Sequence, residues 1–358
     1  MKRSKPTMRI DLRLALLVLL ALLTLALSCF AFMPGQSIKE DGVREDLPAI
    51  DPGAGVAREL QVKLFYRLTN EAYLVGVTST LSVLSSERPE KAMVRELLSG
   101  VPPLANNVSE VIPANTKIVE VSLEGGILYI TLSEGFFDTA IVDAAEREGR
   151  RSLDAGFINQ QEYEARVEAA KQEMMLCRRL AVCSIVNSVT SSDPDVRVHL
   201  LFDLDGDGAG ERVARGELGF EPNLEANSDL LEPMEYDADA VISPLTLVKC
   251  ALDHMMAGEN EKAYVLFAET ESGGMQKPTY ANFETEMLTL GRITGYTLYS
   301  YVVDEGHAQA SVRADLEFTD ASGVTRTLAG ADIALRGEGN LYKLGYYAFK
   351  ALMEGAGV

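Results

Sequence analysis

The sequence predicts an α+β protein of two domains, because two different arrangements of helices and strands follow one another along its 358 residues. Within residues 58–220 a strand–strand–helix pattern occurs twice and is closed by a further strand. Within residues 241–358 helices come first and long alternating strands follow. We therefore expect a duplicated ββα domain with a mixed sheet, followed by a cone-shaped α+β domain.

The first predicted domain opens with two short strands and a helix. Residues 61–66 alternate between apolar and polar side chains, and residues 73–77 form a second strand after a polar turn. Pro89 is expected in the first turn of a helix that runs to Leu98, with Gly100 as its C-cap. These elements form the first strand–strand–helix unit.

The second unit repeats this order with longer helices. Residues 117–123 and 127–132 alternate around a Glu-Gly-Gly turn and predict a hairpin. A long helical stretch follows, breaks at residues 154–156 and ends near Thr190. Residues 196–202 alternate again and predict the closing strand. Two helices over one mixed sheet would bury the apolar faces of these elements.

The second predicted domain begins after an acidic segment at residues 221–240, which we expect to be a linker. Pro244 directly after Ser243 indicates a helix start, and a further helix is expected at residues 279–290. Strand-like runs follow at residues 294–303, 308–319, 325–335 and 341–347. Helices followed by long antiparallel strands favour a curved sheet closed into a cone.

Residues 1–33 have the composition of an export signal or a membrane anchor. Five basic residues lie within residues 1–13, and residues 14–27 follow without a charge. The apolar run continues to Met33, which is long enough to cross a bilayer. A lipoprotein signal, an uncleaved anchor and a released protein are the three open interpretations. Each places most of the chain, after a tether at residues 34–57, outside the cytoplasmic membrane.

The end of this apolar run contains a candidate lipidation site. Ala26-Leu27-Ser28-Cys29 resembles a lipobox, the motif that ends in the lipid-modified cysteine of a bacterial lipoprotein. The small residue before Cys29 fits the motif, whereas Ala26 stands where leucine is usual. Cys29 is therefore the predicted lipidation site of the lipoprotein interpretation.

The charge of the chain argues against nucleic-acid binding. The formal net charge is −20, and the residues after position 13 include 28 basic and 52 acidic ones, a net charge of −24. Such a surface is repelled by phosphate backbones. We therefore expect no nucleic-acid partner.

The sequence contains no combination of residues that is typical of a catalytic centre. It lacks a nucleophile elbow, a phosphate-binding loop and a zinc-binding helix motif. The histidines and the other cysteines have no sequence neighbour at catalytic or zinc-binding spacing; they are His199, His254, His307, Cys177, Cys183 and Cys250. We expect structural roles for them, and hence no catalytic residues, no cofactor and no enzymatic activity.

Residues 202–213, FDLDGDGAGERV, have some features of a cation-binding loop. Asp203, Asp205 and Asp207 occupy positions 1, 3 and 5 of a helix–loop–helix calcium loop. Position 12, however, is Ala214 where glutamate is required, and a strand precedes the loop. We favour a hairpin turn and retain a weak calcium site as the alternative.

The cone predicted for the second domain raises the question of a ligand pocket. Tyr296, Tyr299, Tyr301 and Phe318 are candidate lining residues. Aromatic side chains at strand spacing are more often part of a core. We therefore favour a core role, and the pocket itself stays undefined.

Several segments of residues 58–220 carry a family resemblance: residues 62–66, 73–75, 97–102, 112–118, 128–136 and 176–189. Together they resemble the GerM family, the sporulation and spore-germination domain of Gram-positive bacteria. The most specific segment is the strand that ends in Ser-x-x-Phe at Phe136. Asn115 stands where the family usually has glycine. Residues 139–172 are longer than the family needs, which suggests an inserted helical arm.

The second domain also carries a resemblance, on a helix with Ala263-Tyr264, a strand at residues 307–312 and a terminal strand at residues 341–344. These features are similar to the nuclear-transport-factor-2-like (cystatin-like) fold of small bacterial lipoproteins. Tyr342 stands where that fold usually has tryptophan.

The two resemblances imply a non-catalytic envelope protein tethered to the outer face of the cytoplasmic membrane of a Gram-positive bacterium. GerM modules look like ring-building domains of the channel between mother cell and forespore. The implied partners are therefore envelope or sporulation proteins, further copies of this chain, and the cell wall. Exposed strand edges and helical faces of residues 58–220 are the expected contact surfaces. The alternative is a lipoprotein that binds a small ligand or a cell-wall fragment in the second domain.

Overall fold

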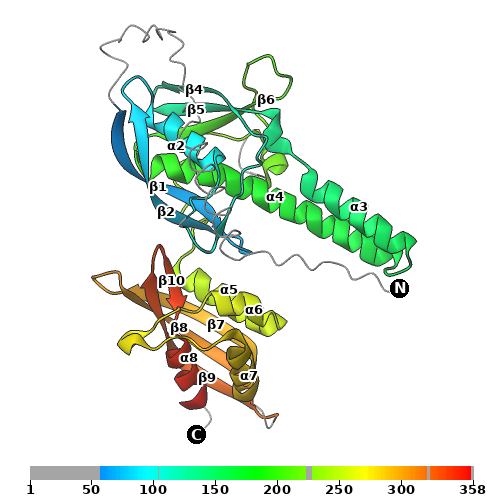
Figure 1. Ribbon diagram of the computed structural model, residues 1–358, viewed down its shortest axis with the longest axis vertical. Helices are drawn as coiled ribbons and strands as arrows, with labels where there is room; N and C mark the ends of the chain where they lie inside the picture. Colours follow the sequence, from blue (N-terminus) through cyan, green and yellow to red (C-terminus); the bar gives the residue numbers. More distant parts are fainter. Residues whose placement is uncertain (1–56, 104, 223–227, 321–322, 356–358) are drawn as a thin grey trace, which may run out of the picture. The chain divides into compact units, whose positions relative to one another are not determined.

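The computed structural model describes residues 57–103, 105–222, 228–320 and 323–355 (Figure 1). The predicted leader or anchor, the tether up to residue 56 and Cys29 lie outside the described residues. Contacts group Ala57–Val358 into one compact unit. The predicted α+β class is confirmed, because helices and several sheets alternate in the expected order.

The first domain contains the predicted strand–strand–helix order twice. The first unit consists of β1 (Ala57–Leu68), β2 (Leu74–Leu84) and α2 (Pro89–Leu98). The second consists of β4 (Ile118–Glu124), β5 (Ile127–Ser133), α3 (Ala140–Asp154) and α4 (Gln160–Thr190), and β6 (Arg197–Asp203) closes the domain. Short additional elements are β3 (Val108–Ser109), η1 (Glu134–Phe137) and η2 (Arg215–Leu218).

The strands of this domain lie in two sheets, where the sequence predicted one. In the described residues, one sheet has the order β2-β1-β3 and the other has the order β4-β5-β6. The second sheet is the mixed one, since β4 and β5 are antiparallel while β5 and β6 are parallel. The long α3–α4 connection allows this parallel crossover, which a tight hairpin cannot make.

The C-terminal half of α4 covers the free edge of β1. Strand β3 pairs only with Arg67 and Leu68, so the rest of that edge needs other partners. Ser184 Oγ donates to the Phe65 carbonyl at 2.5 Å, and the Phe65 N–H donates to Ser188 Oγ at 2.9 Å. Two serines one helical turn apart therefore replace a missing strand.

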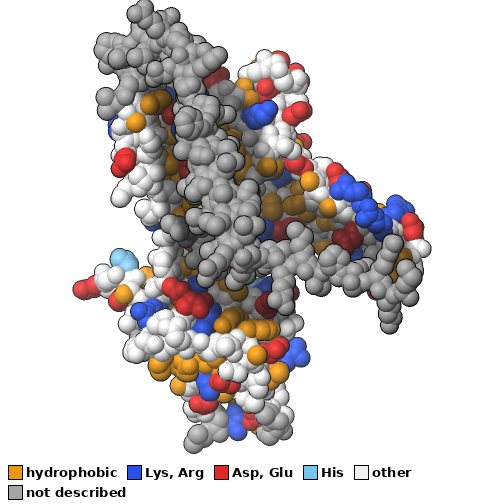
Figure 2. Space-filling view, viewed as in Figure 1, with side chains coloured by type: hydrophobic (Ala, Val, Ile, Leu, Met, Phe, Trp, Pro, Cys, Tyr) orange, Lys and Arg blue, Asp and Glu red, His pale blue; other side chains and the backbone are white. Residues whose placement is uncertain are grey.

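The predicted insertion at residues 139–172 forms a helical arm. Figure 1 shows α3 beside the N-terminal half of α4, directed away from both sheets. The two helices pack closely, because a Cβ atom on Gly149 would lie 2.8 Å from the ring of Tyr163. Phe157, in the turn between the helices, is 84% exposed. Charged side chains cover much of the arm's visible face (Figure 2).

The second domain has the predicted order of helices followed by a sheet. Its helices are α5 (Pro244–Ala257), α6 (Asn260–Val265) and α7 (Tyr280–Leu290), with η3 (Ser272–Gly274) between the last two. Its strands are β7 (Arg292–Val303), β8 (Gln309–Thr319), β9 (Thr325–Glu338) and β10 (Leu341–Leu344). The sheet is antiparallel in the order β10-β9-β8-β7. Register shifts in β7 and β8 mark bulges, which curve a sheet.

The chain ends in a helix that the sequence did not predict. Residues 341–347 were expected to be one strand, but β10 stops at Leu344 and α8 (Tyr346–Gly355) follows. The buried carboxylate of Glu271 accepts the Tyr347 N–H at 2.7 Å and so caps the new helix. This cap lies 76 residues away in the sequence, which is why local patterns do not reveal it.

An aromatic cluster forms much of the second core. Phe267, Phe283, Tyr346 and Phe349 are each at most 2% exposed. The Phe267 ring packs against the other three at centroid distances of 5.2 to 6.1 Å, with interplanar angles typical of edge-to-face contacts. The cluster thereby joins the segment after α6, α7 and the first turn of α8.

The two domains share apolar and backbone contacts. Leu68 and Val75 of the β1–β2 hairpin belong to the same buried cluster as the core of the second domain. The Leu74 N–H donates to the Ala240 carbonyl at 2.8 Å, and the Ile242 N–H donates to the Leu74 carbonyl at 2.9 Å. The end of the segment expected as a linker is therefore hydrogen-bonded along the edge of β2.

Candidate functional site

The aspartate loop forms a turn in which the carboxylates bind the backbone. Asp203 accepts the N–H groups of Gly206 at 2.8 Å and Gly208 at 3.2 Å. Asp205 and Asp207 each accept an N–H two residues further on. The bonds of Asp205 and Asp207 are those of Asx turns.

The same three aspartates also have the proximity that a cation site needs. One oxygen from each lies within 4.8 Å of the others. Asp203 is buried, whereas Asp205 and Asp207 are exposed. After the loop the chain returns to β6 through one isolated bridge, between Phe202 and Glu211, and not through the second strand of a hairpin. The calcium site stays a prediction.

The four aromatic residues proposed for the cone do not face a common space. Phe318 is 1% exposed and belongs to the core, as favoured from the sequence. Tyr299 and Tyr301 are 56% and 46% exposed, so the core role favoured for them is wrong. Tyr296 donates its hydroxyl to Asp253 at 2.5 Å, and burial together with this bond raises the pKa of Tyr296 to about 12.

The cysteines in the described residues are free thiols in protected surroundings. Cys183 and Cys250 are buried, and Cys177 is half-buried. Burial, reinforced by Asp237, raises the pKa of Cys183 to about 12. Burial, reinforced by Glu71, also raises the pKa of Cys250. Reactive cysteines need the opposite shift.

Two of the histidines have simple local contacts. His199 is buried, with Nε2 3.2 Å from the Leu231 carbonyl, and burial lowers its pKa. His307 lies in an exposed turn and has a φ of 53°.

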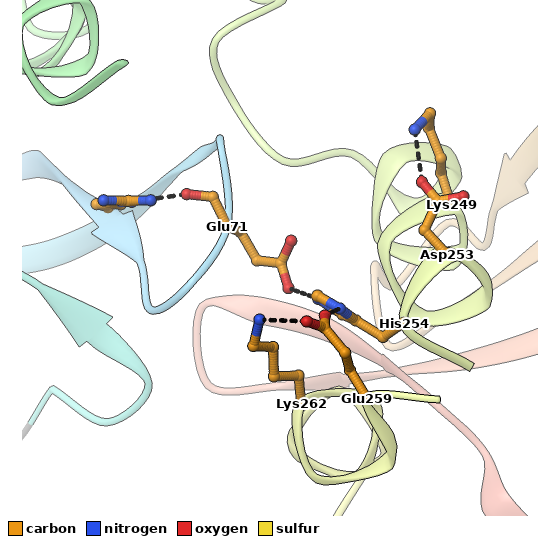
Figure 3. Close-up of polar contacts among 7 residues, drawn as sticks. Glu71, Lys249, Asp253, His254, Glu259 and Lys262 are labelled. Carbon is orange, nitrogen blue, oxygen red and sulfur yellow. Dashed lines mark hydrogen bonds and ion pairs between the residues drawn. The ribbon is translucent and has the colours of Figure 1, made fainter. Parts of the chain in front are cut away.

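His254 differs, because its ring lies between two carboxylates from different parts of the chain (Figure 3). Its Nε2 is 2.7 Å from Glu71 Oε1, and its Nδ1 is 2.7 Å from Glu259 Oε2. The side chains of His254 and Glu71 are 12% and 8% exposed. Glu259 is more open to solvent and also pairs with Lys262 at 2.9 Å. This cluster of four residues, the junction cluster, connects the two domains.

Local backbone conformations place these side chains. Asn70, in the turn after β1, has a φ of 66°, and Glu71 follows it. At the other side, α5 ends at Gly258 with a φ of 77°, and the Glu259 N–H donates to the His254 carbonyl at 2.8 Å. The left-handed C-cap therefore brings Glu259 next to His254.

The hydrogen bonds of His254 determine what the ring can do. A neutral imidazole has one N–H, so it can donate to only one of the two carboxylates. Both contacts become hydrogen bonds when the ring carries both protons. In that form no ring nitrogen retains a lone pair for proton abstraction or metal binding. The His254 ring therefore links one carboxylate from each domain.

Arg67 extends the junction cluster toward α4. Its Nε donates to the Glu71 carbonyl at 2.7 Å, and its Nη1 pairs with Glu173. The Lys262 ammonium, and next the His254 ring, lower the pKa of Glu259 by hydrogen bonding. The sequence did not reveal this arrangement, because Glu71 and His254 are 183 positions apart.

No helix among the described residues is both long and apolar enough to cross a bilayer.

A family model matches part of the first domain. Residues 63–206 match the Germane family, which is described as sporulation and spore germination. This range runs from β1 into the aspartate loop. A search of curated proteins gives no match.

Two solved structures are similar to parts of the chain. The tandem GerMN domains of the sporulation protein GerM from Bacillus subtilis are 14% identical, covering 53% of this chain and 51% of that chain at a TM-score of 0.28. This chain therefore spans about half the length of that protein. The Δ5-3-ketosteroid isomerase from Mycobacterium sp. is 16% identical, covering 28% of this chain and 89% of that chain at a TM-score of 0.23.

Proposed function

We propose that the protein is a non-catalytic, membrane-tethered envelope protein that acts by protein–protein contact in sporulation, germination or cell-envelope assembly. The observation that carries the proposal is the match of residues 63–206 to the sporulation and spore germination family. The basic and apolar start of the sequence, with Cys29 at its end, supports a tether on the outer face of the cytoplasmic membrane.

Fewer strand edges of the first domain are open to a partner than the sequence suggested. The edge of β1 is occupied by α4, and the edge of β2 near Leu74 is occupied by residues 240–242. Strand β4 is an edge strand with partly exposed Val119 and Leu123. An unpaired strand edge is a template for pairing with another chain. We assign partner contact to this edge and to the arm tip at Phe157.

Sedimentation and labelling experiments test this proposal. Homo-assembly predicts that residues 57–358 form concentration-dependent oligomers in analytical ultracentrifugation; a strict monomer at high concentration argues for a different partner.

Cys29→Ala should abolish metabolic palmitate labelling if the lipoprotein interpretation holds. Membrane retention without any labelling of the natural sequence supports the uncleaved anchor. Clearing of cell wall in zymography would contradict the proposal that the protein is non-catalytic.

A cavity in the second domain favours ligand binding as a second candidate function. Its volume is about 280 Å³. Its apolar lining residues are Met255, Met287, Leu288, Leu290, Ile293, Phe349 and Met353. Such a lining suits an apolar group of a small ligand. A thermal-shift screen with muropeptides and small metabolites tests it, and a shift lost in Ile293→Trp would place the ligand here.

A further inference from the structure

A second, smaller cavity lies where the two domains meet, and no feature of the sequence predicted it. Its volume is about 180 Å³. The first domain contributes Leu68, Val75, Val77 and residues 105–108. The second contributes residues 338–341, in the turn between β9 and β10, and Lys343.

Lys343 is the unusual member of this lining. Its side chain is 5% exposed, and its Nζ lies 3.6 Å from Glu338 Oε1. That distance is longer than a hydrogen bond but within the range of an ion pair. An ammonium has three donors and is costly to bury without partners.

Lys277 provides a comparison within the same domain. It is also 5% exposed, but its Nζ is 2.6 Å from Glu269 Oε1. It also lies 3.3 Å from two backbone carbonyls and 4.1 Å from the ring centroid of Tyr264. A lysine buried for structural reasons is thus surrounded by acceptors here, whereas Lys343 faces a cavity.

The rest of the cavity separates into polar and apolar parts. Asn106, Asn107 and Asn340 contribute amide groups; Asn106 and Asn340 are exposed, and Asn107 is half-buried. Leu68, Val75 and Val77 are at most 8% exposed and form an apolar wall. An ammonium with one ion-pair partner, nearby amides and an apolar wall together suit a small amphiphilic anion.

We infer that this cavity binds a small aliphatic monocarboxylate. The carboxylate accepts hydrogen bonds from the Lys343 ammonium and the asparagine amides, and the short hydrocarbon chain packs on Leu68 and Val75. Glu338 limits the charge of the ligand, because a second negative charge would lie close to its carboxylate. Its other oxygen accepts the Glu269 N–H at 2.8 Å, which holds Glu338 in place.

The size of the cavity sets the size of the ligand. A water molecule takes up roughly 30 Å³ in the liquid, so this space suits a molecule of about six non-hydrogen atoms. Butyrate has six, and butyramide has the same shape without the charge. The cavity is separate from the partner surfaces proposed above, so either proposal can fail alone.

Calorimetric titration of the full chain, held in dodecyl maltoside, tests the site with sodium butyrate as the probe. We expect a dissociation constant of about 1 mM or lower, and at least about tenfold weaker binding of butyramide. Lys343→Met, which keeps the length of the side chain, should remove this difference between the two probes. Asn340→Ala, in the exposed turn, should weaken butyrate binding several-fold without changing the thermal midpoint.

Two results would overturn the inference. One is the absence of butyrate binding at about 50 mM, which means that the cavity holds water only. The other is equal binding of butyrate by the natural sequence and Lys343→Met. If Lys343→Met does not fold, equal affinity of Asn340→Ala and the natural sequence for butyrate has the same meaning. A Lys277→Met variant controls for the loss of a buried charge, and its butyrate affinity should not change.

Discussion

The two halves of α4 belong to one continuous helix but have opposite environments. Residues 160–172 form one side of the arm, and Val167 is the one buried side chain of residues 160–179. From Leu180 to Thr190 every side chain is buried, including Ser184, Asn187 and Ser188. In this inner half the polar groups bind defined backbone partners in other elements. The comparison shows that buried polar residues, as well as apolar ones, fix where this helix lies.

The largest loss of stability is expected on substitution of Asn187, in the inner half of α4. Its amide donates to the Asp237 carbonyl and accepts the Asp237 N–H, both at 2.8 Å. Asn187→Leu leaves both backbone groups unpaired, and we expect a loss of about 3 kcal/mol in the free energy of unfolding. Urea unfolding of residues 57–358 measures it.

The matched control lies in the outer half of the same helix. Gln161→Leu makes a similar change at an exposed position, and it should alter stability by less than about 0.5 kcal/mol. Equal effects of the two variants would mean that the two bonds to Asp237 contribute nothing specific.

The next largest loss of stability is expected on substitution in the junction cluster. Removing the His254 ring leaves the carboxylate of Glu71 buried without its ion-pair partner, so His254→Leu should cost about 2 kcal/mol. Glu71→Leu combined with His254→Leu removes both charges and should recover part of that loss. A double-mutant cycle from chemical unfolding gives the coupling. Strictly additive effects of the two substitutions would contradict an interaction across the junction.

The difference between the halves of α4 also shows what the sequence can and cannot predict. Apolar periodicity and the break at residues 154–156 predicted both helices of the arm, because these signals are local. The contacts of Ser184 with Phe65 and of His254 with Glu71 join residues 119 and 183 positions apart. Their residue types are unremarkable in sequence, and only the folded chain brings them together. The cavity at Lys343 could not be predicted from the sequence for the same reason.

A smaller effect concerns pH and the exposed member of the junction cluster. Lys262 and then His254 lower the pKa of Glu259 below its ordinary value of 4.5. Because the folded-state pKa is the lower one, the stabilisation is present above 4.5 and is lost as the pH falls through the folded-state pKa. Since Glu259 is 42% exposed, we expect well under 1 kcal/mol.

Thermal unfolding of the natural sequence and Glu259→Gln between pH 7 and pH 3 measures this effect. The stability difference should be greatest near neutral pH and vanish at the acid end. A difference that persists at pH 3 would mean that packing, not charge, is what the substitution changes.

The smallest effect on stability is expected at the arm tip, beside the outer half of α4. Phe157 is 84% exposed, so Phe157→Ser should change the free energy of unfolding by less than about 0.5 kcal/mol. The same substitution should weaken self-association or partner binding measurably if the arm is a contact surface, because exposed aromatic side chains often anchor interfaces. Leu288→Ser, at a 70% exposed position of the second domain, is the matched control. If ultracentrifugation shows equal association for both variants and the natural sequence, the arm is not the contact and the β4 edge becomes the surface to mutate.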